Sequence, residues 1–310
     1  MGRVHTLDPA KFRDPRVTAK GEARATVRLE KLRTLWFNTG TLCNIACKGC
    51  YIESSPTNDR LVYLAKDDVG PFLDELDPEV EIGFTGGEPF MNPHIIELLG
   101  MALALGHRVL VLTNAMRPMM RLRVLEGLLF LRREYGERLV LRVSLDHPDE
   151  AMHDAERGEG SFDETIAGID WLMANGFEVH VAGRLWGADE ATLRRRYGAL
   201  FTDLGWPIDE KKPPELVLFP EMDPQADVPE ITTACWDILG VHPQDMMCSS
   251  SRMIIKRAGQ SRPVVTACTL LPYDPRFELG ATLAESAVEV ALNHPHCAKF
   301  CVLGGGKCAA

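Results

Sequence analysis

Between residues 34 and 220 the sequence alternates strictly between short apolar runs and longer amphipathic segments. The apolar runs predict β-strands at 34–39, 80–84, 107–114, 138–146, 177–187 and 214–220. The amphipathic segments predict helices at 66–76, 93–106, 117–136, 161–176 and 189–205. Because alternating strands and helices build parallel sheets with right-handed crossovers, we expect an α/β fold, a partial (β/α)6 TIM-like barrel. In such folds the chemistry lies at the carboxyl ends of the strands.

The pattern changes after Pro220. Residues 253–267 alternate around a turn and predict a β-hairpin, and residues 281–294 predict a helix. We therefore expect three regions. They are an N-terminal lead-in over 1–33, the barrel over 34–230, and a small C-terminal hairpin-and-helix extension over 231–310.

Bulk properties exclude several classes of protein. The polar N-terminus has no apolar core of a signal peptide, and no apolar run is long enough to span a bilayer. We therefore expect a cytoplasmic protein without a membrane partner. The net charge of −10 argues against a nucleic-acid partner, because such proteins usually present a basic face.

The nine cysteines fall into two groups separated by a long cysteine-free stretch. The first group is Cys43, Cys47 and Cys50, and the second is Cys235, Cys248, Cys268, Cys297, Cys301 and Cys308. A disulfide framework is disfavoured because the cytosol keeps thiols reduced. The grouping predicts two separate cofactor sites.

The first group has the spacing Cys43-x3-Cys47-x2-Cys50, followed directly by Tyr51. Three thiols are one short of the four ligands that zinc and common iron–sulfur clusters require. Together with Gly-Gly-Glu-Pro at 86–89, this spacing resembles the radical SAM superfamily over residues 34–220.

The resemblance implies an explanation for the missing ligand. In this family three cysteines hold a [4Fe–4S] cluster, and S-adenosylmethionine chelates the remaining iron. An electron from the reduced cluster cleaves S-adenosylmethionine, and the resulting 5′-deoxyadenosyl radical takes a hydrogen atom from the substrate. A flavodoxin- or ferredoxin-type protein is the implied electron donor.

The resemblance also places the S-adenosylmethionine pocket at the strand ends. The implied residues are Tyr51, Gly86, Gly87, Glu88, Pro89, Asn114, Ser144, Asp146 and Arg184. The two glycines would let the backbone approach the methionine, whose ammonium group Glu88 would engage. Asp146 would accept from paired ribose hydroxyls, and the planar fork of Arg184 would hold the methionine carboxylate. The alternatives are a cap at Asp146 and a solvated strand end at Arg184.

Four cysteines of the second group, Cys248, Cys268, Cys297 and Cys301, bracket the expected hairpin and follow the expected helix. This arrangement resembles the twitch extension, a shortened SPASM domain that binds an auxiliary [4Fe–4S] cluster. The long first gap and the Cys-x3-Cys pair depart from the twitch pattern, so Cys308 could replace one ligand. Structural zinc is the alternative.

Two cysteines remain if those four are ligands. Cys235 and Cys308 would then be candidate catalytic hydrogen donors for a redox-neutral epimerisation or rearrangement, although Cys235 beside Trp236 also suits a small buried hydrophobe. An auxiliary cluster favours oxidation of the substrate instead. A non-enzymatic iron–sulfur or zinc-binding module is the alternative from another class.

The substrate is expected to be a small molecule, with a peptide as the alternative. Peptide-modifying relatives often carry an N-terminal winged-helix domain, and the lead-in is too short for one. Trp186, Glu221 and Asp223 could face the substrate beside Arg184.

Overall fold

The computed structural model describes residues 6–223 and 225–306. Its main sheet is mixed and has the strand order β10-β9-β8-β2-β3-β4-β5-β6-β7. The last six strands of that order are parallel and follow the order of the chain. Their bounds are β2 (Thr34–Asn38), β3 (Glu81–Thr85), β4 (Val109–Thr113), β5 (Leu139–Ser144), β6 (Glu178–Arg184) and β7 (Leu216–Phe219). The expected α/β fold with a largely parallel sheet is confirmed.

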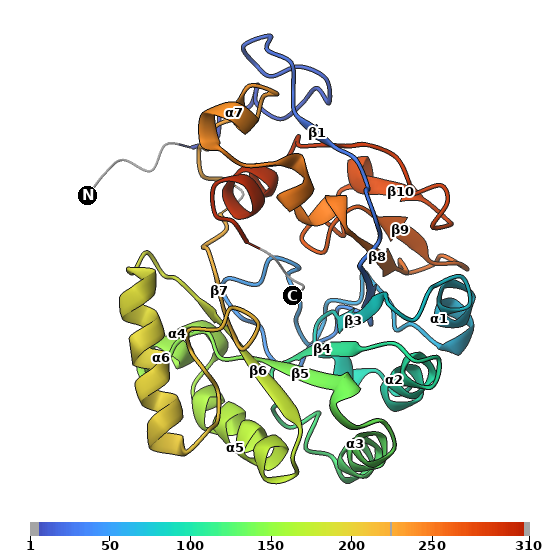
Figure 1. Cartoon of the computed structure of the whole chain (residues 1–310), viewed down its shortest axis with the longest axis vertical. Helices are drawn as coiled ribbons and strands as arrows, with labels where there is room; N and C mark the ends of the chain where they lie inside the picture. The colour runs from blue at the N-terminus through green and yellow to red at the C-terminus, as the bar shows by residue number, and fades with distance from the viewer. Residues whose placement is uncertain (1–5, 224, 307–310) are drawn as a thin grey trace.

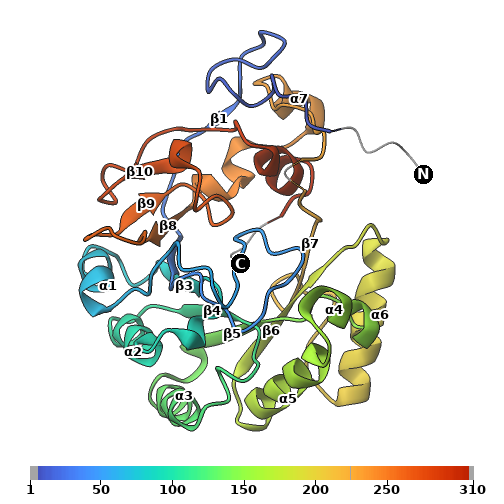
Figure 2. The same ribbon diagram turned by 180° about the vertical axis from the view of Figure 1, so that it is seen from behind.

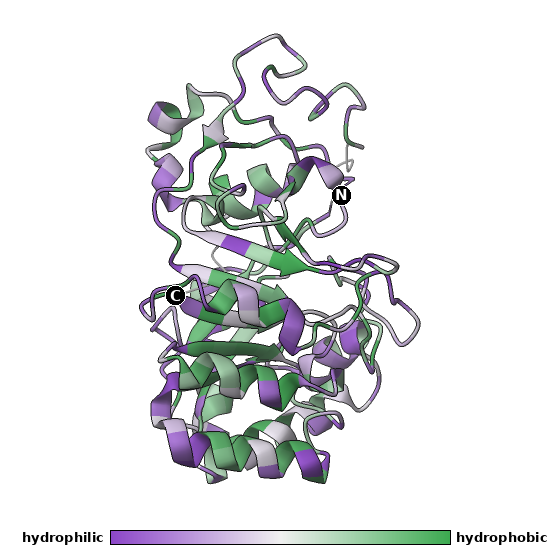
Figure 3. Cartoon of the chain, turned by 90° about the vertical axis from the view of Figure 1, so that its right-hand side faces the viewer, coloured by the Kyte–Doolittle hydropathy of each residue, from purple (hydrophilic) through white to green (hydrophobic). Residues whose placement is uncertain are grey.

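Helices cover the outer face of the parallel strands (Figures 1 and 2). They are α1 (Lys66–Leu73), α2 (Ile95–Ala104), α3 (Leu122–Tyr135), α4 (Glu150–Arg157), α5 (Ser161–Ala174) and α6 (Glu190–Leu204). Because successive strand residues face opposite sides, Leu35 and Phe37 pack under the helices while Trp36 packs on the inner face. Figure 3 shows hydrophobic strands in the middle and hydrophilic residues on the outer helices. The sequence analysis did not anticipate α4.

The C-terminal hairpin forms as expected and extends the main sheet. Strand β8 (Ser251–Ile255) lies parallel to β2, and β9 (Val264–Thr266) returns antiparallel to it. Strand β10 (Glu278–Gly280) pairs with β9. A short helix, α7 (Cys235–Leu239), precedes the hairpin, and a π-helical segment, Cys297–Val302, follows it.

The expected helix at 281–294 is wrong. The segment contains turns and the short strand β11 (Val290–Ala291), which pairs with β1 (Thr26–Val27). Nε of the buried Arg252 donates to the carbonyl oxygen of Ser286 at 3.1 Å, and Leu292 N donates to the carbonyl oxygen of Ala25 at 3.0 Å. These distant partners take backbone groups that a helix would use internally, so tertiary contacts override the local pattern.

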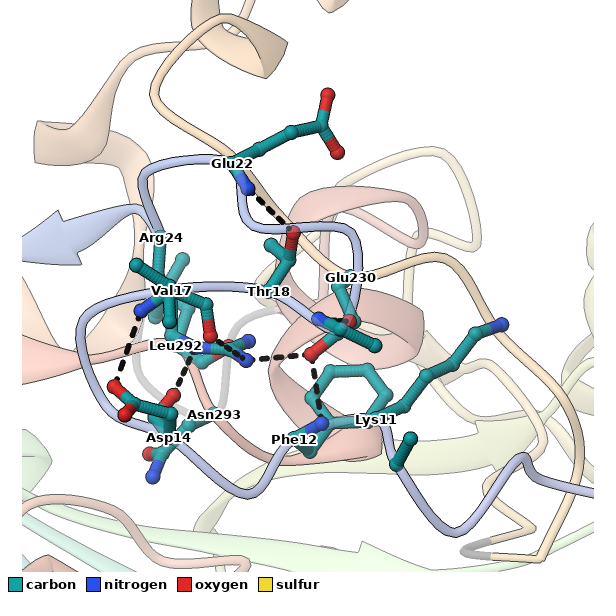
Figure 4. A network of polar contacts seen from close by, with 12 residues as sticks. Lys11, Phe12, Asp14, Val17, Thr18, Glu22, Arg24, Glu230, Leu292 and Asn293 are labelled. Carbon is teal, nitrogen blue, oxygen red and sulfur yellow. Dashed lines mark hydrogen bonds and ion pairs between the residues drawn. The ribbon is translucent and has the colours of Figure 1, made fainter.

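The lead-in is irregular and packs against the C-terminal extension (Figure 4). The guanidinium of the fully buried Arg24 side chain forms an ion pair with Glu230 at 2.5 Å. Glu230 also accepts hydrogen bonds from the backbone N–H groups of Phe12 and Ala19. These contacts fasten the lead-in to the segment that follows β7. Among the described residues no helix has the length and apolar character that crossing a membrane requires.

Candidate active site

A cavity of about 150 Å³ lies at the carboxyl ends of the parallel strands. It is lined by the cysteine loop and by residues at the ends of β3 to β7. Ten of the predicted site residues line it: Cys43, Cys47, Cys50, Tyr51, Gly86, Gly87, Asn114, Ser144, Asp146 and Arg184. The fold thus brings together residues that lie far apart in the sequence.

Burial disfavours the charged forms of two of the three thiols, Cys43 and Cys47. Burial, with smaller contributions from the negative charges of Glu88, Cys47 and Cys50, raises the pKa of Cys43 to about 12. Burial also raises the pKa of Cys47. Because thiolate is the form that binds metals, the three side chains require a strongly positive partner to be ligands together. An iron–sulfur cluster meets this requirement, so the residues present fit the group.

Gly86 and Gly87 hold the cysteine loop in place. Gly86 has a φ of +139°, and a Cβ atom there would lie 2.4 Å from the carbonyl oxygen of Gly40. A Cβ atom on Gly87 would lie 2.2 Å from the carbonyl oxygen of Leu42. Gly87 N donates to the Gly40 oxygen at 2.8 Å. The close approach that requires glycine is therefore to the backbone immediately before Cys43.

Glu88 is buried beneath the cavity and is not among the lining residues. Its carboxylate accepts hydrogen bonds from Phe90 N at 3.1 Å, Thr113 Oγ1 at 2.9 Å and Asn114 N at 2.8 Å. Burial raises the pKa of Glu88 to about 7, although these hydrogen bonds oppose the shift. The contacts join the ends of β3 and β4. Pro89 also lies outside the lining and begins a short 3₁₀ turn. Binding of the methionine ammonium by Glu88 stays a prediction.

Arg157, at the end of α4, is a site residue that the sequence analysis missed. Its Nε and Nη2 atoms contact the two carboxylate oxygens of Asp146 at 2.9 and 3.0 Å. Burial raises the pKa of Asp146, but the charge and hydrogen bonds of Arg157, together with the charge of Arg184, outweigh burial, and the net shift of the pKa is downward. The pair therefore stays charged inside the cavity wall. Two local signals in the sequence could have predicted helix α4: Asp149, which caps its N-terminus, and Gly158, which ends it.

Arg184 lies against the cysteine loop. A Cβ atom on Gly49 would lie 2.2 Å from Nη1 of Arg184, so the guanidinium covers that glycine closely. The guanidinium also lies over the Trp186 ring at 4.3 Å, and Nη1 is 3.8 Å from a carboxylate oxygen of Glu156. The backbone carbonyl of Glu156 accepts from Lys48 N at 3.0 Å. Residues of helix α4 and of the end of strand β6 therefore contact the middle of the cysteine loop, at Lys48 and Gly49.

The remaining wall of the cavity is apolar and was also missed. It consists of Phe219, Pro220, Met222, Leu270 and Phe300. The rings of Phe219 and Phe300 lie 5.6 Å apart, which joins the end of β7 to the π-helical segment. This wall faces the cavity between the sheet and the C-terminal extension. No local pattern could reveal it, because its members come from three distant segments.

All four cysteines predicted for the auxiliary site line one second cavity. Cys248, Cys268, Cys297 and Cys301 surround it. Burial raises the pKa of Cys248 to about 11 and that of Cys297 to about 12. Leu270 lines this cavity as well as the first. The two cysteine sites therefore share a wall.

Several predicted residues lie apart from both cavities. Cys235, at the start of α7, contacts Thr232 and lines neither cavity. Cys308 lies outside the described residues. Trp186 lies behind the lining, where its Nε1 donates to the Asp146 carbonyl oxygen at 3.1 Å. Within residues 6–223 and 225–306, no group of three or more His, Cys, Asp or Glu side chains is arranged to hold a single metal ion.

A parallel α/β sheet with three cysteines at its carboxyl edge defines a class of iron–sulfur proteins. The sequence pattern of the Radical SAM superfamily matches residues 37–196, more than half of the 310-residue chain. The chain therefore belongs to the radical SAM superfamily. Membership supports an enzyme with a [4Fe–4S] cluster and S-adenosylmethionine as cofactors, and it disfavours the non-enzymatic module.

Two curated relatives resemble part of the chain. The antilisterial bacteriocin subtilosin biosynthesis protein AlbA of Bacillus subtilis (strain 168) is 35% identical over 143 residues, which cover 45% of this chain and 30% of AlbA. The AdoMet-dependent heme synthase of Oleidesulfovibrio alaskensis is 31% identical over 143 residues, which cover 45% of this chain and 34% of the synthase. The matched part spans about a third of each relative.

The fold is similar to that of a solved structure. Streptococcus suis SuiB bound to S-adenosylmethionine matches 81% of this chain and 64% of SuiB, with a TM-score of 0.60 and 12% identity. At this identity the likeness shows a shared fold.

Proposed function

We propose that the protein is a radical SAM enzyme that removes a hydrogen atom from a peptide and, with its second cysteine site, oxidises it. The observation that carries this proposal is the convergence of Cys43, Cys47 and Cys50 with the Asp146–Arg157 pair on one cavity. When bound, the cluster and S-adenosylmethionine would supply a 5′-deoxyadenosyl radical there. A flavodoxin- or ferredoxin-type protein would deliver the electron.

The polar wall has the groups to bind and orient S-adenosylmethionine. The three thiols would hold the cluster. Arg157, fixed by Asp146, presents a buried positive charge beside Cys47, which suits a carboxylate or a thiolate-bound cluster. Ser144 lies next to this pair at the end of β5 and offers a hydroxyl to the ribose. Arg184 is held against the cysteine loop, and its guanidinium would supply a positive charge for the methionine carboxylate.

The apolar wall suits the substrate side of the reaction. Phe219, Met222, Leu270 and Phe300 carry no charge, and an apolar surface of this kind would help to keep water from a reactive radical. The same surface would accept an apolar side chain. Among the described residues, β7 pairs only with β6, so its outer edge offers backbone groups to an extended peptide.

The likeness to AlbA, named for bacteriocin biosynthesis, supports a peptide substrate. SuiB, which shares the fold, has been crystallised with its precursor peptide SuiA. A small-molecule substrate is the second candidate, and the likeness to the heme synthase favours it.

The second cysteine site supports oxidation as the outcome. It shares Leu270, a residue of the apolar wall, with the first cavity, so the two sites adjoin each other. Cys248, Cys268, Cys297 and Cys301 would hold an auxiliary cluster, which would supply an acceptor for the electron of a substrate radical, and a proton would leave to solvent to complete the loss of two hydrogens. Cys235 lies away from the cavity, which weakens its candidacy as the hydrogen donor of an epimerase.

Metal analysis and product mass test the proposal. Anaerobically reconstituted protein should hold about eight irons per chain for two four-iron clusters. With candidate peptides from neighbouring genes, the product should be lighter by two hydrogens. About four irons with one zinc would overturn the auxiliary cluster, and an isobaric product carrying solvent deuterium would assign a redox-neutral epimerase.

A further inference from the structure

The side chain of Tyr273 ties the segment after Cys50 to the loop after Cys268. Its hydroxyl donates a hydrogen bond to the carbonyl oxygen of Ile52 at 2.9 Å. The same hydroxyl accepts a hydrogen bond from Nδ2 of Asn58 at 3.2 Å. The Tyr273 hydroxyl thus makes two hydrogen bonds to the segment after Cys50, one as donor and one as acceptor. Together they fix the position of that segment.

The fixed segment in turn surrounds Cys50. Ser54 N lies 3.3 Å from Cys50 Sγ, and Glu53 N donates to the Cys50 carbonyl oxygen at 3.0 Å. Glu53 has a φ of +51°, which residues other than glycine rarely adopt. Asn58 Nδ2 donates to the Glu53 carbonyl oxygen at 2.8 Å and so supports this backbone. Asn58 therefore contacts both Tyr273 and the strained residue behind Cys50.

The other end of the connection lies at the second cysteine site. Leu270 N is 3.3 Å from Cys268 Sγ, and the Leu270 side chain lines both cavities. Asp274 N donates to the Leu271 carbonyl oxygen at 3.3 Å, which closes a turn around Tyr273. A metal group on Cys268 would restrain this short loop, and the loop carries Tyr273.

The Tyr273 ring is held independently of its hydroxyl. The Arg60 guanidinium lies over the ring, 3.6 Å from its centre, and forms an ion pair with Glu53. Removing the hydroxyl alone should therefore leave the ring in place. Removing the hydroxyl therefore tests the hydrogen bonds of Tyr273 without changing the packing of its ring under Arg60.

We infer that Tyr273 is a positioning residue through which a filled second cysteine site sets the geometry of Cys50 and so the affinity for S-adenosylmethionine. The inference rests on the proposed function and adds a coupling between the two cysteine sites, which by thermodynamic linkage is reciprocal. The connection runs from Cys268 through Tyr273 to the segment beside Cys50.

The test uses the anaerobically reconstituted full chain, with S-adenosylmethionine as the probe. Tyr273→Phe should keep the wild-type iron content and raise the dissociation constant for S-adenosylmethionine roughly two- to tenfold, the range for one hydrogen bond. The electron paramagnetic resonance spectrum of the reduced protein with S-adenosylmethionine should change. The control Thr57→Ala, an exposed change in the same segment, should alter neither readout.

A double-mutant cycle separates coupling from a local effect. Cys268→Ser should also weaken binding of S-adenosylmethionine, and adding Tyr273→Phe to it should have little further effect. Unchanged affinity and spectrum in Tyr273→Phe, or two effects that simply add, would overturn the inference. If the wild-type protein itself fails to cleave S-adenosylmethionine, the proposed function fails instead, so the two failures are distinguishable.

Discussion

Arg157 and Asp146 form a two-point ion pair in the wall of the cysteine-lined cavity, with contacts of 2.9 and 3.0 Å. The pair connects α4 to the end of β5, and it places a permanent positive charge near Cys47. Because both side chains are largely buried, each depends on the other to remain charged at low cost.

Removing one partner of this pair should be costly. Arg157→Ala leaves the Asp146 carboxylate buried without its counter-charge, so we expect the free energy of unfolding to fall by about 3–5 kcal/mol. Affinity for S-adenosylmethionine should also fall. Urea unfolding under anaerobic conditions measures the first effect, and equilibrium binding measures the second.

The matched control for Arg157 is Arg108→Ala. Arg108 forms an ion pair with Glu178 at 2.7 Å, but its side chain is 48% exposed. An exposed pair of this kind contributes only about 0–1 kcal/mol. Equal losses of stability in the two variants would contradict the role given to the buried pair.

Gly87→Ala should displace the cysteine loop. The new methyl group would lie 2.2 Å from the Leu42 carbonyl oxygen, so backbone must move next to Cys43. We expect the iron content to fall by about four per chain, the content of one cluster. Iron and sulfide analysis after reconstitution measures this loss.

Gly100→Ala in α2 is the control for this substitution. Its methyl group would lie 3.5 Å from a Leu131 methyl carbon, an ordinary contact. Because alanine favours the helix interior over glycine by about 0.5–1 kcal/mol, this variant should be as stable as wild type or more stable. Full iron content in Gly87→Ala would refute the positional role of the glycine.

The ion pair of the lead-in predicts a pH dependence of stability. Burial raises the pKa of Glu230, but hydrogen bonds from Phe12 and Ala19 and the charge of Arg24 outweigh burial and lower it. The pair therefore stabilises the fold above the ordinary glutamate pKa of about 4.3. This contribution is lost as the pH falls through the lowered pKa of the folded state.

Glu230→Gln removes the titrating group. Stability should fall by about 3–5 kcal/mol at pH 7, because Arg24 is left buried without its counter-charge. The difference between wild type and variant should shrink below about pH 4, where the wild-type carboxylate becomes protonated. Urea midpoints from pH 7 to pH 3.5 measure this difference; a constant difference over that range would rule out Glu230 as the titrating group.

The sequence predicted the parallel strands well because most of the apolar runs end at or close to a Gly, Asn, Asp or Pro. It missed α4 because His153 is the only buried residue of that helix, so no apolar repeat marks it. It placed a helix at 281–294 because the buried Arg252, which takes the Ser286 carbonyl, lies 34 residues away. Local periodicity does not report such distant partners.

The sequence likewise predicted one part of the candidate site and missed another. The cysteine spacing and the paired glycines at 86 and 87 are local motifs, and the structure brings them to one cavity. Arg157 and the apolar wall of Phe219, Leu270 and Phe300 depend on tertiary packing. Sequence motifs therefore predicted the cofactor side of the cavity, but they did not predict the substrate side.

Formation of 5′-deoxyadenosine tests the central claim most directly. Anaerobically reconstituted protein, reduced in the presence of S-adenosylmethionine, should release 5′-deoxyadenosine and methionine. Cys47→Ala should abolish the release while keeping about four irons at the second site. Thr57→Ala should behave like wild type. The absence of 5′-deoxyadenosine from wild-type protein with its full iron content would contradict the assignment of Cys43, Cys47 and Cys50 to a radical SAM cluster.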